Sequence, residues 1–189
     1  MRSTIASAAG LALLLVAAPA PAAPPGWAVV PAKSRIGFSG VYAGNKFAGT
    51  IGKWNATIRF DPAALPASSV NVVIATASAS TGDKFQDTTL AGAEWFDPGQ
   101  FPRATFASSR ITAAGPGRYV ADGTLTLKGK ATPVRLPFTL KMAGDTATIS
   151  GSTTLDRIAL GLGTKSDPTG AWVSKPIMLN VDLTATRAK

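Results

Sequence analysis

The sequence predicts an all-β fold: an eight-stranded antiparallel, lipocalin-like barrel with a short helical insertion at about residues 83–96. Three observations predict it. Apolar and polar residues alternate along most of the chain after residue 25. Glycine (19 residues) and proline (14) separate these runs, as is typical of short strands joined by tight turns. Hydrophobic residues make up 46% of the 189 residues and charged residues 15%, so one domain can bury a substantial core.

The first three expected strands are 35–39, 53–60 and 70–74. In the second of these, Trp54, Ile58 and Phe60 alternate with polar residues, and Asp61 followed by proline ends the run as a turn. Such alternation places one face of each strand toward a core and the other toward water.

The insertion comes next, because Phe85, Leu90 and Trp95 recur at spacings closer to those of a helix than of a strand. Thr81 or Asp83 can cap its start, and two prolines at 98 and 102 end it. The pair of aspartates at 83 and 87 would also suit a metal ion, but capping and solvation explain both better.

Five further strands are expected at 104–111, 119–127, 134–140, 147–155 and 177–184, with a hairpin loop at 128–130. Consecutive antiparallel strands tend to close into a barrel, because closure removes unpaired edges. At eight strands the interior is just wide enough for side chains or one small ligand. An immunoglobulin-like sandwich is the alternative architecture. Charged outward residues such as Arg59 and Asp182 disfavour an outer-membrane barrel.

Residues 1–22 have the features of a cleavable signal peptide, and residues 23–189 form the expected barrel domain. Arg2 supplies a positive start, and the apolar run at 8–18 is short for a membrane-spanning helix. Ala20 and Ala22 are small residues at the positions that precede a cleavage site. We therefore expect a periplasmic protein.

Charge and composition exclude several function classes. The formal net charge is +9, and removal of the signal peptide takes away Arg2 and no acid, which lowers it by one to +8. The basic residues are scattered rather than clustered, so no nucleic acid partner is expected. The chain contains neither cysteine nor histidine, so the commonest catalytic bases and thiol nucleophiles are missing.

No enzyme and no metal site is predicted, since the ten acidic residues show no calcium-loop spacing. A hydrolase that uses a pair of carboxylates from Asp83, Asp87 and Glu94 is the remaining enzymatic alternative.

Several blocks, in their order and spacing, resemble the YceI family. They are Trp27 followed by KSRIGF (33–38), GTIGKW (49–54), FPRATF (101–106) and YVADGTLTLKG (119–129). The resemblance implies an exported barrel with a long hydrophobic tunnel that binds polyprenyl chains, isoprenoid quinones or similar lipids without catalysis. It implies a long-chain isoprenoid lipid as the ligand, with no other cofactor. A membrane redox protein and a second copy of the chain are conceivable further partners.

The residues expected to contact a lipid fall into three groups. Inward-facing strand residues would line the tunnel, residues of the insertion would cover one end, and residues of the loop 162–172 would meet a polar head. The three groups are, in that order, Phe38, Trp54, Ile58, Val72, Ile74, Phe106, Leu125, Phe138, Ile149 and Leu179; Phe85, Leu90, Trp95 and Phe96; and Lys165 and Trp172. Arg157 is a second candidate for the polar head.

A barrel filled by its own side chains would use the same residue types. The second functional hypothesis is therefore a non-catalytic protein-interaction module whose outer surface binds another protein.

Overall fold

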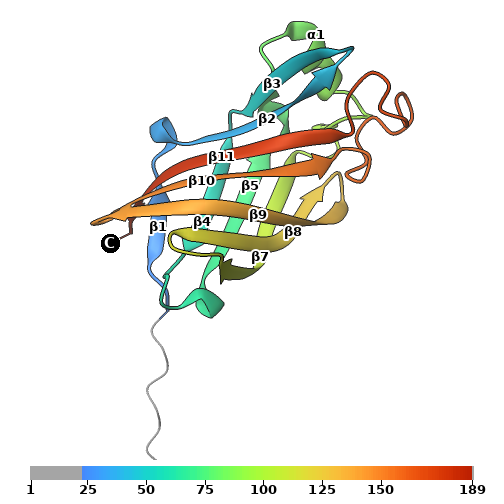
Figure 1. The fold of residues 1–189 in the computed structure, drawn as a ribbon. Helices are drawn as coiled ribbons and strands as arrows, with labels where there is room; N and C mark the ends of the chain where they lie inside the picture. The colour runs from blue at the N-terminus through green and yellow to red at the C-terminus, as the bar shows by residue number, and fades with distance from the viewer. Residues whose placement is uncertain (1–22, 189) are drawn as a thin grey trace, which may run out of the picture.

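The computed structural model describes residues 23–188, and the expected signal peptide lies outside the described residues. Eight strands form a closed antiparallel ring, in which the first strand pairs with the last (Figure 1). In ring order they are β1 (Gly26–Val29), β4 (Trp54–Arg59), β5 (Ser69–Ala75), β7 (Arg103–Ala113), β8 (Arg118–Leu127), β9 (Lys130–Ala143), β10 (Thr146–Asp156) and β11 (Pro176–Arg187). The predicted eight-stranded barrel is confirmed, and closure of the ring excludes the alternative sandwich.

The N-terminal part of the barrel is a bent strand followed by a hairpin. β1 pairs with the end of β11, and β2 (Arg35–Tyr42) pairs with the middle of β11, on either side of the short 3-10 helix η1 (Pro31–Lys33). β3 (Asn45–Ile51) returns beside β2 through a turn in which Ala43 and Gly44 have positive φ angles of 47° and 82°. A two-residue β-strand, β6 (Ala79–Ser80), borders β3.

The expected strand 35–39 is thus the start of β2, whereas β1 closes the ring. β1 and β3 are absent from the expected set because β1 is short and a glycine interrupts the apolar face of β3.

The helical insertion is confirmed, although it is shorter than expected. α1 spans Lys84–Leu90, and the chain then continues in turns to Phe101. Asp83 is its N-cap, since a carboxylate oxygen accepts a hydrogen bond from the Gln86 N–H at 2.9 Å. Asp87 accepts hydrogen bonds from the hydroxyls of Ser80 and Thr81, so both aspartates have structural partners.

Two further 3-10 helices, η2 (Leu65–Ala67) and η3 (Thr76–Ser78), flank β5. Among residues 23–188, no helix has the length and apolar character needed to cross a bilayer.

Candidate functional site

The barrel encloses an apolar cavity of about 240 Å³. Its lining includes side chains from all eight ring strands, from β2 and β3, and from the segment after α1. Along β10 the lining runs from Ala147 to Leu155, eight residue steps that correspond to roughly 27 Å of strand. The cavity is therefore elongated, and its shape suits a chain-like molecule.

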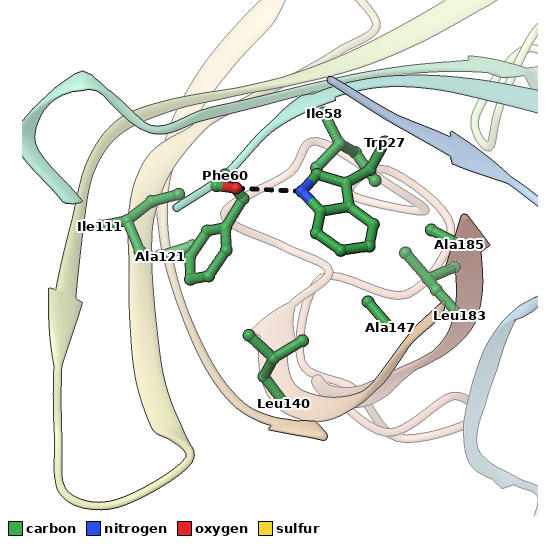
Figure 2. Close-up of a cluster of buried hydrophobic side chains, with 9 residues drawn as sticks. All are labelled: Trp27, Ile58, Phe60, Ile111, Ala121, Leu140, Ala147, Leu183 and Ala185. Carbon is green, nitrogen blue, oxygen red and sulfur yellow. Dashed lines mark hydrogen bonds between the residues drawn. The ribbon is translucent and has the colours of Figure 1, made fainter. Parts of the chain in front are cut away.

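One end of the cavity is closed by a cluster of buried side chains, shown in Figure 2. The Trp27 indole lies among Ile58, Leu183 and Ala185, and its N–H donates a hydrogen bond to the Phe60 carbonyl at 2.9 Å. This hydrogen bond satisfies the one polar group of the indole, so the tryptophan can be buried among apolar side chains without an unpaired donor.

A second buried cluster lies further along the barrel, where Ala104 and Leu127 pack with Leu160 and Leu162. Trp95 and Phe96 of the insertion pack against it.

The middle of the barrel is hollow. Phe38, Phe106, Leu136 and Leu179 all line the cavity, yet each is half-buried rather than buried. An inward-facing residue of a closed barrel stays accessible when the space in front of it is empty. The described structure therefore differs from a barrel filled by its own side chains.

Glycines beneath aromatic rings widen this space. A Cβ atom at Gly123 would lie 2.6 Å from Cζ of Phe106, and one at Gly40 would lie 3.0 Å from the Phe47 ring. Because these glycines lack a Cβ, each ring can lie against the wall rather than project into the cavity. In the same way, the absence of a Cβ atom at Gly49 leaves room for the ring of Phe38.

The structure brings together thirteen of the sixteen residues expected to contact a ligand. The thirteen that line the cavity are Phe38, Trp54, Ile58, Val72, Ile74, Leu90, Trp95, Phe96, Phe106, Leu125, Phe138, Ile149 and Leu179. Their contact with a lipid stays a prediction.

Phe85, Trp172 and Lys165 lie outside the lining. Phe85 is on the solvent side of α1 and 69% exposed, and Trp172 is 63% exposed. Lys165 is exposed in the loop beside Glu94, so it does not reach the cavity. Sequence reasoning also missed lining residues of β3, Phe47 and Ile51, which a period-two alternation through Gly49 could have revealed.

Arg157 is the one charged residue of the lining in the described structure, and its side chain is completely buried. Its Nη1 group donates to the carbonyls of Leu162 and Gly163, at 2.8 and 3.3 Å. Its Nη2 group donates to the Asp167 carboxylate at 2.6 Å and to the Val173 carbonyl at 2.9 Å, and Nε also donates to the latter at 3.2 Å. All five N–H groups are thus engaged, and none is left for a ligand head.

Asp167 also makes hydrogen bonds within the loop 157–175. Its carboxylate accepts hydrogen bonds from the backbone N–H groups of Ala171, Trp172 and Val173, and the bond from Val173 is the leading cause of its lowered pKa. The Arg157 charge adds to this effect. Arg157 and Asp167 together order the loop 157–175 and are, in this respect, structural.

Thr76 is the one lining residue with a hydroxyl in the described structure, and this hydroxyl donates a hydrogen bond to the Phe101 carbonyl at 2.6 Å. Neither Arg157 nor Thr76 is therefore free to orient a substrate. Residues 23–188 contain no group of three or more acidic side chains placed to hold a metal ion. The arrangement can bury an apolar chain, whereas it offers no acid, base or nucleophile inside the cavity.

Comparison with known proteins matches residues 27–185 to the family model described as a YceI-like domain. A UPF0312 protein of Pseudomonas syringae pv. tomato is 30% identical over 111 residues, which cover 59% of this chain and 55% of that protein. A UPF0312 protein of Yersinia enterocolitica is 34% identical over 110 residues, with 58% and 54% covered. The chain thus spans about half the length of these curated relatives.

Among solved structures, BcnA of Burkholderia cenocepacia superimposes with a TM-score of 0.80 at 35% identity, over 84% of this chain and 99% of BcnA. A polyisoprenoid binding domain from Saccharophagus degradans superimposes with a TM-score of 0.66 over 87% of this chain and 99% of that domain. At 10% identity the second likeness concerns the fold.

Proposed function

The chain belongs to the YceI-like family, and from this premise we propose that it is a carrier that holds a long-chain isoprenoid lipid, such as a polyprenyl chain or a quinone, inside its barrel. The observation that carries the proposal is the hollow middle of the barrel, where inward-facing apolar side chains remain half-buried in front of empty space.

The energetics favour such a ligand. Each methylene group removed from water contributes about 0.8 kcal/mol, so about ten buried carbons would contribute roughly 8 kcal/mol before the costs of association are subtracted. A polar head inside the cavity would gain no hydrogen bond from Arg157 or Thr76, since both are already engaged. Affinity thus arises from the chain, and the head remains outside.

One of the comparisons supports the proposal. The structure from Saccharophagus degradans is described as polyisoprenoid binding, and its fold is the same. Within the proposal, the chain works in the periplasm after removal of residues 1–22, performs no catalysis, and passes a quinone to a membrane redox protein. Homodimerisation belongs to the same proposal, and size-exclusion chromatography with light scattering tests it.

Native mass spectrometry of residues 23–189, purified from the producing cells without detergent, tests the carrier function. A discrete added mass that organic extraction releases as a polyprenyl or quinone species is expected. A protein that remains free of ligand after incubation with such lipids would overturn the proposal and favour the protein-interaction module. The N-terminal residue of the protein recovered from the periplasm tests the expected cleavage after Ala22.

Two neighbouring valines provide a matched pair of variants. Val72 points into the cavity, whereas Val73 is 42% exposed on the outer face of the same strand. Val72→Trp places an indole in the cavity and is expected to abolish the added mass, while Val73→Trp adds the same indole to the surface and should keep it. Equal lipid content in the two variants would show that the ligand binds elsewhere.

A further inference from the structure

The wall of the barrel is incompletely hydrogen-bonded along one side of β4. β4 pairs with β5 at all six of its residues, from Trp54 to Arg59, but with β1 only at Ile58 and Arg59. On the far side of this interruption, β3 pairs with β2 over most of its length and with β6 only at its last two residues. We call the interruption between β1, the end of β3 and β4 the seam.

A groove of about 1020 Å³ runs along the seam. Its apolar lining comes from the inward faces of three strands and includes Val29, Ile51, Trp54 and Ala56. Ile51 and Trp54 line the interior cavity as well. At this point a single layer of side chains separates the cavity from the outside.

The rim of the groove is polar and carries two exposed cations, Lys33 at the end of η1 and Arg35 at the start of β2. Asp182 is the one acidic residue of the groove lining; it lies opposite Arg35 in the pairing of β2 with β11 and accepts a hydrogen bond from Ser150 at 2.7 Å, so two cations stand against one carboxylate. Neither Lys33 nor Arg35 takes part in an ion pair among residues 23–188. The rim therefore carries a net positive charge, which favours the binding of an anion.

We propose that the seam is the lateral entrance to the cavity for a single-chain amphiphile with an anionic head, a phosphate or a carboxylate. The chain passes between Ile51 and Trp54 into the barrel, and the head stays in the groove against Lys33 and Arg35. A charged head taken into the cavity would lose its hydration and find the one lining cation of the described structure, Arg157, already engaged, which is costly. The inference rests on the proposed carrier function and adds the ligand's charge and its point of entry.

Two probes that differ only in the head test the inference: geranylgeranyl phosphate and geranylgeraniol. Their dissociation constants are measured by tryptophan fluorescence on the protein of residues 23–189, at low and at high salt. Two exposed cations should favour the phosphate by about ten-fold at low salt, and less at high salt. Lys33→Glu/Arg35→Glu should abolish this preference while affinity for the alcohol is unchanged.

Lys46→Glu/Lys175→Glu is the matched control, because both lysines are exposed and the net charge changes equally. It should keep the ten-fold preference. Loss of the preference in this control, or its survival in Lys33→Glu/Arg35→Glu, would overturn the assignment of the head to the seam. Equal affinity of the unaltered protein for both probes would overturn only the part of the proposal that gives the ligand an anionic head. If neither probe binds, the carrier function itself fails, and this inference fails with it.

Discussion

Adding one methyl group at Gly123 tests whether glycines beneath aromatic rings keep the cavity open. The new Cβ would lie 2.6 Å from Cζ of Phe106 and 2.5 Å from the carbonyl oxygen of Ala107. Since carbon atoms pack at about 3.5 Å, the ring must move by roughly 0.9 Å, and the only free direction is toward the cavity. The carbonyl belongs to the backbone and cannot swing aside, so β7 must shift as well.

Overpacking of this kind costs about 1–3 kcal/mol, and the loss of glycine's freedom in the unfolded chain offsets about 0.4–1 kcal/mol. Gly123→Ala should therefore be destabilised by about 1–2 kcal/mol, which lowers the urea midpoint by roughly 0.5–1 M for a typical slope. It should also bind geranylgeraniol several-fold more weakly, because the displaced ring narrows the cavity.

Gly37→Ala is the reference variant. Its Cβ would meet its nearest neighbour, the Gly49 carbonyl, at an ordinary 3.5 Å on the outer face of β2. Its urea midpoint should be unchanged or higher. Coincident urea transitions for Gly123→Ala and Gly37→Ala would refute the packing argument.

Two further predictions concern the closed end and the loop 157–175. Trp27→Phe removes the buried hydrogen bond to the Phe60 carbonyl and should lower the free energy of unfolding by about 1–3 kcal/mol, measured by urea denaturation, whereas the exposed Trp172→Phe should leave it unchanged. The hydrogen bond from the Val173 N–H holds the pKa of Asp167 below its ordinary 3.8, so the carboxylate stabilises the loop fully above that value and less as the pH falls through the lowered pKa. Hydrogen exchange should show that the backbone amides of the loop lose protection only in this acidic range. In Asp167→Asn the protection of these amides should not depend on pH in this range. A loss of protection in the unaltered protein already between pH 6 and 5 would show that another group is responsible.

Most of the barrel could be predicted because each strand has one face toward the interior and one toward water. Alternation identified the strand that carries Trp54 and Ile58, and the observed pairing with β5 places both on the inner wall. β1 was not predicted, because four residues are too few for a periodic pattern and its position depends on β11, about 160 residues later in the chain. Long-range pairing of this kind leaves no local signal.

The candidate site was predicted less completely, for a physical reason. Alternation reveals which side chains point inward, but it does not say whether the space they face is filled. The hollow at Phe106 depends on Gly123 of the neighbouring strand, and the alternating pattern that places Gly123 in the expected strand 119–127 does not show which side chain lies over it.

The structural role of Arg157 was not predicted. The sequence suggested Arg157 as a partner for a ligand head, whereas its N–H groups donate hydrogen bonds to carbonyl groups of its own loop. Those carbonyls carry no side-chain signature in the sequence.

Closure of the ring by its first and last strands has a consequence for how the protein folds. Trp27 pairs with Arg187, so the ring is joined only when the far end of the chain is present. Until then β1 has no partner on that side, and the loop that must be closed spans nearly the whole domain, which makes closure entropically slow. A nascent chain would therefore remain open throughout its synthesis, and under the proposed export it could be engaged by an export machinery before the cavity exists.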